Sequence, residues 1–202
     1  MIPRGITAAQ ADRYLRTARQ LEFALRVDAG PALDGGAISL ATDLRAASVD
    51  GVVQLDEQDI GRLVQCEIIA TLLPGPAFFL GTGRFPPARR LIDAGAAVAL
   101  ASGYNPETSP SQNMQMMMSL ACTSMRMTPA EAITAATINA AHAVRRASRL
   151  GSLESGKRAD LLILSVPDYR EIPYHFGVNL VDLVMTGGEI LVRRSEVRWP
   201  AN

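Results

Sequence analysis

The apolar positions in the first half of the chain follow two patterns, continuous runs typical of buried strands and i, i+3, i+4 repeats typical of helices. The runs predict strands at residues 23–27, 49–53, 68–73 and 97–101. The repeats predict helices at residues 7–21, 56–66 and 86–95, and a helix or a turn at residues 37–44. Because strand and helix alternate, the pattern predicts β/α units around a parallel sheet.

Local signals indicate where some of these elements begin and end. Thr7 and Gln10 have the spacing of a capping box, as do Thr128 and Glu131, and a proline follows Thr128 at the first helical position. We therefore expect helices to start just after Thr7 and just after Thr128. The sequence Pro74-Gly75-Pro76 ends the third apolar run and predicts a loop.

The strongest helical pattern follows the fourth predicted strand. Its apolar face consists of Met114, Met117, Met118, Ala121 and Met125. A methionine stripe is more often core filling than an adaptable partner surface, so we expect this face to be buried. The helix after Thr128 is predicted to bury a second face, which consists of Ile133, Ala136, Thr137, Ala140 and Val144.

The pattern changes after residue 150, where short strand-like runs replace the β/α alternation. Runs at residues 159–164, 183–185 and 190–192 predict strands, the last two joined by a turn at Gly187-Gly188. The chain is therefore expected to divide into a β/α part, residues 1–150, and a small β-sandwich-type segment, residues 151–202.

Composition disfavours several classes of function. The 20 basic and 20 acidic residues cancel, so the overall charge shows no footprint for nucleic acid or an anionic membrane. No apolar run approaches the roughly 20 residues that a membrane helix needs. Cys66 and Cys122 are too few for a disulfide framework and stand among apolar neighbours, so we expect reduced core thiols in a cytoplasmic protein.

Six segments in a fixed order carry a resemblance to a known family. They are Thr-Leu-Leu-Pro-Gly (71–75), Asn-Pro (105–106), Met-Arg-Met-Thr-Pro (125–129), Ala-Ala-Thr-Ile-Asn-Ala-Ala (135–141), Gly-Ser-Leu-Glu-Ser-Gly-Lys-Arg-Ala-Asp-Leu (151–161) and Pro-Tyr-His-Phe-Gly-Val-Asn (173–179). Together they resemble imidazolonepropionase over nearly the whole chain, although Gly-Lys-x-Ala-Asp-Leu alone marks only the wider amidohydrolase superfamily.

The resemblance implies a zinc- or iron-dependent (β/α)8 barrel that hydrolyses 4-imidazolone-5-propanoate to formiminoglutamate. The expected fold class is α/β, the C-terminal half of a TIM-like amidohydrolase barrel plus a small β appendage. Residues 1–150 would be the half barrel with its C-terminal helices, and residues 151–202 the appendage with the motif at 174–179. The first four strands and a His-x-His metal pair have no counterpart here. The active site of such a barrel lies at the C-terminal ends of its strands. The residues at those positions therefore decide which of the family's functional side chains this chain has.

At three strand ends the family's metal-binding and proton-transferring side chains are replaced. The family's His-Ala-Glu-Gln, Asp-His and Asp-Phe-Asn-Pro-Gly-Ser correspond here to Asp28-Ala29-Gly30-Pro31, Asp50-Gly51 and Gly103-Tyr104-Asn105-Pro106-Glu107-Thr108. The resemblance therefore assigns no catalytic residue and no metal ligand. Only Asn105 and Thr108 match substrate-binding positions. Asp28 is interpreted as a cap or turn residue, with an oxygen ligand to a metal as the alternative, and His142 and His175 as structural residues.

A catalytic zinc or iron needs about three protein ligands and an open position for water. We therefore expect no cofactor in this chain and no hydrolysis by the chain alone. One hypothesis is a non-catalytic binding or partner subunit with a weak pocket for a small acid near Asn105 and Thr108. The other is half of a split hydrolase whose metal site is supplied by another chain.

The expected half barrel also bears on partners. Four parallel strands cut from a barrel leave two sheet edges open. This predicts an obligate homo-oligomer or hetero-oligomer that completes the barrel. Nucleic acid and membranes are not expected as partners.

Overall fold

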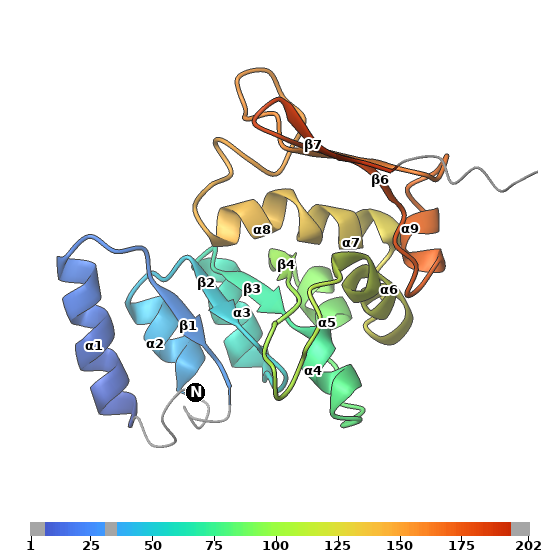
Figure 1. Cartoon of the computed structure of the whole chain (residues 1–202). Helices are drawn as coiled ribbons and strands as arrows, with labels where there is room; N and C mark the ends of the chain where they lie inside the picture. The colour runs from blue at the N-terminus through green and yellow to red at the C-terminus, as the bar shows by residue number, and fades with distance from the viewer. Residues whose placement is uncertain (1–6, 31–35, 195–202) are drawn as a thin grey trace, which may run out of the picture.

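The computed structural model describes residues 7–30 and 36–194, which contain one parallel and one antiparallel sheet (Figure 1). The parallel sheet has the order β1-β2-β3-β4, with strands Arg26–Asp28, Ser48–Asp50, Ile69–Leu72 and Val98–Leu100. The antiparallel sheet has the order β5-β6-β7, with strands Leu161–Leu164, Val181–Thr186 and Glu189–Arg193. The predicted α/β class and the parallel sheet are confirmed, and Gly187 and Gly188 form the predicted turn with left-handed backbones.

Helices join the parallel strands in the predicted order. Helix α1 (Ala8–Gln20) precedes β1, and the helices between strands are α2 (Ala37–Asp43), α3 (Glu57–Gln65), α4 (Pro74–Phe79) and α5 (Ala88–Asp93). Both predicted capping boxes, at Thr7 and Thr128, are present. The prediction of a loop after residue 73 was wrong, because α4 starts there with a proline in its first turn, a position at which a missing N–H costs no hydrogen bond.

The first strand is shorter than its apolar run predicts. Phe23 was expected to open it, but its side chain is 65% exposed and β1 begins only at Arg26. Within the sheet, Val27, Val49, Ala70 and Val98 are register partners and share one face. That face belongs to the main core, into which α2, α3 and α5 also bury side chains.

The other face of the parallel sheet carries polar side chains in its first strands. Asp28, Asp50, Thr71 and Ala99 are register partners along it. Ala99 and the β3 residue Ile69 pack against Ala143 of α8 in a small second core cluster. The face is thus apolar where α8 covers it and polar toward β1.

The methionine helix is α6 (Met114–Ser124), and its predicted face lies largely in the core. Met117, Met118 and Ala121 are buried and so is Met125, the residue after the helix, whereas Met114 is partly buried. These contacts confirm the core-filling interpretation.

The segment after Thr128 forms two helices where one was predicted. They are α7 (Pro129–Ala136) and α8 (Ile138–Ala143), and they separate at Thr137, whose φ of −119° and ψ of −93° are not helical. Val144 follows α8 and is 45% exposed, and Thr137 is exposed too, so their predicted burial was wrong. The other three residues of the predicted face are only partly buried, and the buried residues of α7 and α8 are Ala132, Ala135, Ala141 and Ala143. The break at Thr137 changes the helix phase, so a period extrapolated across it points to the wrong face. Figure 1 shows α7 and α8 between the two sheets.

The segment after residue 164 packs against the β/α part of the chain. Helix α9 (Glu171–Tyr174) packs against α6. The Gln115 side chain accepts a hydrogen bond from the Leu180 N–H at 3.0 Å and donates one to Asn179 Oδ1 at 3.2 Å. Side-chain amide contacts therefore join α6 to the segment that leads into β6. No helix in the described ranges is both long and apolar enough to cross a membrane.

The two cysteines differ in exposure. Both are free thiols, but Cys66 is exposed because it caps the C-terminus of α3, so its predicted place in the core was wrong. Cys122 is half-buried in α6, and burial raises the pKa of its thiol.

Two arginines of α5 bind carboxylates of neighbouring helices. Arg89 donates two 3.0 Å hydrogen bonds to the oxygens of Glu131. Arg90 forms an ion pair with Glu57. These contacts tie α5 to α7 and to α3.

The Arg89–Glu131 pair should make stability depend on pH. Hydrogen bonds from Arg89 hold the pKa of the Glu131 carboxyl below its usual value. A carboxyl with a depressed folded-state pKa stabilises the protein above its unfolded pKa of about 4.3, and this contribution is lost as pH falls through the folded-state value. We expect Glu131→Gln to cost about 1 kcal/mol at pH 7.

Urea unfolding at pH 7 and at pH 3 measures this contribution. The cost of Glu131→Gln should shrink at the lower pH, because the unfolded wild-type chain then binds a proton at this carboxyl. Glu57→Gln is the matched control, because the Glu57 side chain is 84% exposed and its pair with Arg90 should contribute little. Equal costs for Glu131→Gln at both pH values would contradict the assignment.

Candidate functional site at the carboxyl edge of the sheet

The candidate site is the edge at which β1, β2, β3 and β4 end side by side. The register places Asp28 beside Asp50 and Asp50 beside Thr71. The residues that follow each strand, including Gly51 and Leu73, reach over this edge. In a barrel of parallel β/α units, side chains at these positions face bound ligands.

Asp28 occupies a turn at the end of β1. Its Oδ1 accepts a hydrogen bond from the Gly30 N–H at 2.8 Å. A Cβ added to Gly30 would lie only 3.1 Å from the same oxygen, so the turn favours a residue without a side chain. This geometry supports the turn role over the ligand role. Pro31, the last residue of this motif, lies outside the described residues.

Asp50 is held by neighbouring polar groups on the sheet face. Its Oδ1 accepts a hydrogen bond from Ser48 Oγ at 2.9 Å, and its Oδ2 lies 4.0 Å from Arg26 Nε. The adjacent Thr71 hydroxyl is buried and has no hydrogen-bond partner within the described residues. Burying a hydroxyl without a hydrogen-bond partner costs free energy of folding. Packing alone therefore does not account for the polar side chains on this face.

Leu73 and Asp28 border the space between the second and fourth strand ends. Gly51 and Gly103 have left-handed backbones, with φ of 73° and 61°. A Cβ built on Gly51 would lie 3.3 Å from Asp28 Oδ1 and 3.6 Å from Leu73 Cδ1, and one built on Gly103 would lie 3.3 Å from Leu73 Cδ1. Leu73 therefore lies between the two positions at which the resemblance expects metal-binding or substrate-binding side chains. Periodicity alone does not reveal this, because Leu72 and Leu73 read as equivalent members of one apolar run.

The loop after β4 brings Asn105 and Thr108 together. Asn105 Oδ1 accepts hydrogen bonds from the N–H groups of Glu107, at 2.8 Å, and Thr108, at 3.2 Å. Asn105 also forms an isolated β-bridge with Ser109. Asn105 is exposed and Thr108 half-buried. The structure thus places both on one turn, and their contact with a substrate stays a prediction.

The donors at this edge do not fit a catalytic zinc or iron centre. Across residues 7–30 and 36–194, no three His, Cys, Asp or Glu side chains group closely enough to hold a metal ion. His142 is exposed on α8, and His175 Nε2 lies 3.5 Å from Glu171 Oε2 next to α9, so neither reaches the carboxyl edge. Asp28 and Asp50 are engaged in the hydrogen bonds described above. A metal-activated water would need about three ligands here.

Restoring an aspartate at position 103 should be unfavourable. Gly103→Asp would place a side chain on a left-handed backbone and 3.3 Å from Leu73, and we expect a loss of about 2 kcal/mol in unfolding free energy. The matched control is Gly83→Asp, whose φ of 66° is similar but whose Cβ would meet nothing within 4 Å.

Thermal or urea unfolding of both variants measures this difference. The control should lose only about 1 kcal/mol, the cost of the backbone conformation alone. Equal losses would mean that Leu73 does not occupy the space beside Gly103.

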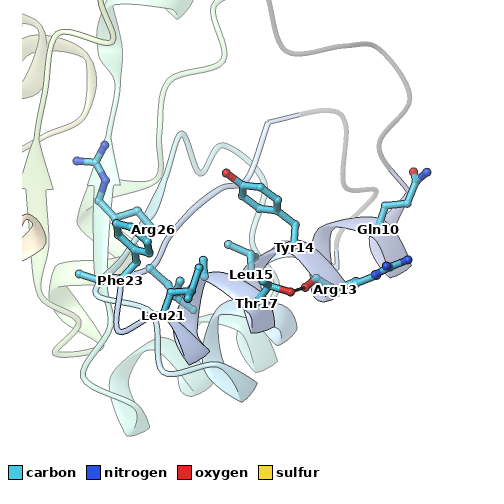
Figure 2. Close-up of a pocket in the computed structure, with 11 residues that line it drawn as sticks. Gln10, Arg13, Tyr14, Leu15, Thr17, Leu21, Phe23 and Arg26 are labelled. Atoms are coloured by element: carbon cyan, nitrogen blue, oxygen red, sulfur yellow. Dashed lines mark hydrogen bonds between the residues drawn. The ribbon is translucent and has the colours of Figure 1, made fainter.

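A second hollow lies away from this edge. It is a cavity of about 720 Å³ between α1 and the segment that enters β1 (Figure 2). Its apolar lining includes Tyr14, Leu21 and Phe23, which are 75%, 65% and 65% exposed. This groove adjoins β1, the first strand in the sheet order.

Comparison with known proteins defines the family. The sequence model of the amidohydrolase family matches residues 37–191, and the chain belongs to this family. Within it, the chain is similar to imidazolonepropionases. It is 47% identical to that of Parabacteroides distasonis over 90% of this chain and 43% of the relative, and 45% identical to that of Geobacillus kaustophilus over 96% of this chain and 46% of the relative. The chain thus spans less than half the length of these relatives.

Solved structures support the same fold. An adenosine deaminase from Xanthomonas campestris with bound zinc aligns with a TM-score of 0.76 at 19% identity, over 92% of this chain and 49% of that one. The guanine deaminase of E. coli aligns with a TM-score of 0.70 at 15% identity, over 93% and 53%. The partial coverage fits a half-length barrel and confirms the predicted fold class.

Proposed function

We propose that this chain is a non-hydrolytic imidazolonepropionase-like protein that binds a small acid at the carboxyl edge of its sheet. The observation that carries the proposal is the donor set of this edge, where no three His, Cys, Asp or Glu side chains of the described residues group closely enough to hold a metal ion. Water activation by a metal needs about three such ligands, and Gly51 and Gly103 stand at two of the positions where the resemblance expects them. Loss of a glutamate at Gly30 also removes the group that would move protons to the leaving nitrogen.

Binding of an acid is supported by the turn after β4. Asn105 uses its side-chain carbonyl oxygen to hold the turn, which leaves its amide N–H2 available as a donor. The half-buried hydroxyl of Thr108 stands on the same turn. An amide donor and a hydroxyl donor on one turn suit a carboxylate ligand.

Two measurements on the purified chain test the proposal. With added Zn²⁺ or Fe²⁺, consumption of imidazolone propionate should not exceed the rate in buffer. Glutarate, a propanoate-like acid, should shift the backbone amide NMR signals of the 105–109 turn, and Asn105→Ala together with Thr108→Val should abolish the shifts. An enzyme-like rate that a chelator removes would overturn the proposal.

A second candidate is half of a split hydrolase, and the groove beside β1 favours it. Exposed Tyr14, Leu21 and Phe23 lie next to β1, an edge strand in the described part of the sheet, and would be covered by a β/α segment that continues the barrel. In this case another chain supplies the missing strands and all metal ligands. Native mass spectrometry of the chain isolated from its source distinguishes the two. A heteromer that carries a transition metal would support the split hydrolase, and a metal-free chain or homo-oligomer would support the non-hydrolytic protein.

A further inference from the structure

Three helices end together at the amino edge of the parallel sheet, opposite the site described above. They are α2, α3 and α8. Shortly after each helix stands a charged residue with a left-handed backbone, Arg45 with φ of 49°, Glu67 with φ of 53° and Arg145 with φ of 54°. Glycine is the usual residue in this conformation at helix C-termini, because any side chain strains it. Glu22 and Arg126 follow α1 and α6 in the same conformation, so the backbone alone does not distinguish this edge.

These residues line a common cavity. Its volume is about 520 Å³, within the range of small-ligand pockets. Arg45 and Arg145 border it together with Gln65 and His142, and the thiol-bearing Cys66 lies on the same wall. A smaller adjoining cavity shares Arg45 and Arg145 and adds one residue of each charge, Arg19 and Glu22. The two arginines thus border both cavities.

The two shared arginines form no ion pair with the rest of the described chain. The ion pairs of residues 7–30 and 36–194 engage other arginines, such as Arg89 and Arg90, but neither Arg45 nor Arg145. Glu67 is the single carboxylate on the larger cavity. Glu67 and the negative ends of the three helix dipoles together offset the charge of the two arginines, so the hydrogen-bond donors of the guanidinium groups, and not a net positive charge, distinguish this cavity.

We propose that this cavity binds a small oxyanion, a carboxylate or a phosphate, between Arg45 and Arg145. Guanidinium groups match such anions because their donors form a planar fork. Gln65 and His142 supply further hydrogen-bonding groups, while Ala46 and Ile69 form an apolar wall for a short carbon skeleton. The site is independent of the carboxyl edge and of the hydrolysis assay.

Cys66 provides a local probe of this site. In a Cys122→Ala background it is the one remaining thiol of the chain. Two disulfide reagents are compared: 5,5′-dithiobis(2-nitrobenzoate), which carries two carboxylates, and 4,4′-dithiodipyridine, which is neutral. The ratio of the anionic to the neutral reaction rate should be higher for Cys66 than for a free thiol in solution. Arg45→Ala with Arg145→Ala should lower the rate of the anionic reagent about tenfold and leave that of the neutral reagent nearly unchanged. Arg84→Ala, which removes an exposed arginine far along the chain, is the control.

Ligand protection gives a second readout that needs no arginine variant. At constant ionic strength, inorganic phosphate and glutarate should each slow the reaction of Cys66 in a saturable manner, and neutral glutaramide should not. The more effective of the two anions identifies the ligand as phosphate-like or carboxylate-like. Protection no greater than that by chloride, or an anionic rate that the double variant does not change, would overturn the proposal.

Discussion

Replacing Gly75 with alanine is expected to lower the free energy of unfolding by about 3 kcal/mol. Gly75 lies in α4 with a helical backbone, so the cost is steric and not conformational. A Cβ at this position would come within 2.3 Å of Ser109 Oγ and 2.8 Å of the Ser102 carbonyl oxygen. The Ser109 hydroxyl itself donates to that carbonyl at 2.9 Å, so the new methyl group would push apart a hydrogen-bonded pair.

The same substitution should disturb the candidate site. Ser109 is the bridge partner of Asn105, and therefore a displaced Ser109 moves the turn that holds Asn105 and Thr108. Gly61→Ala is the matched control, since Gly61 is also helical, in α3, and its Cβ would meet nothing within 4 Å. Alanine there should stabilise the protein by about 0.5 kcal/mol. Urea unfolding of the two variants, with NMR of the 105–109 turn, tests both expectations, and similar stabilities would contradict the close approach.

Leu72→Ala is expected to cost about 3 kcal/mol, the second large effect. Leu72 is fully buried in β3 and belongs to the main core under the helices. Removal of three side-chain carbons leaves a cavity that the surrounding side chains fill only in part. The measurement is equilibrium unfolding in urea.

Leu73→Ala is the control in the neighbouring position. Leu73 is only half-buried and lies over the carboxyl edge, so its truncation should cost about 1 kcal/mol or less. It should also lower the cost of Gly103→Asp, because the contact at 3.3 Å would be gone. If Leu73→Ala were as destabilising as Leu72→Ala, Leu73 would be a residue of the main core and not of the carboxyl edge.

Elements with strong local sequence signals were predicted correctly. The run Ile-Ile-Ala-Thr-Leu-Leu at 68–73 predicted a buried parallel strand, and β3 is one. Capping boxes at Thr7 and Thr128 predicted helix starts that the structure confirms. Such signals depend on residues within one or two turns of each other, and local geometry is enough to decide them.

Elements that depend on distant contacts were harder to predict. The break at Thr137, the exposure of Val144 and the exposure of Cys66 all follow from how helices end against the sheet. The resemblance located the candidate site and predicted which side chains it lacks. It did not indicate that Leu73 fills the space beside Gly51 and Gly103, because that contact joins the ends of three strands.

The sequence by itself determined the α/β class, the order of the strands and helices, the family and the replacement of the family's metal-binding side chains. Only the tertiary structure decided what lies in their place at the carboxyl edge, and which charges meet at the amino edge. Arg45 and Arg145 are a hundred residues apart in the chain and line one cavity because α2 and α8 end at the same edge of the sheet. Side-chain patterns specify elements locally, whereas sites form where parallel strands bring distant element ends together.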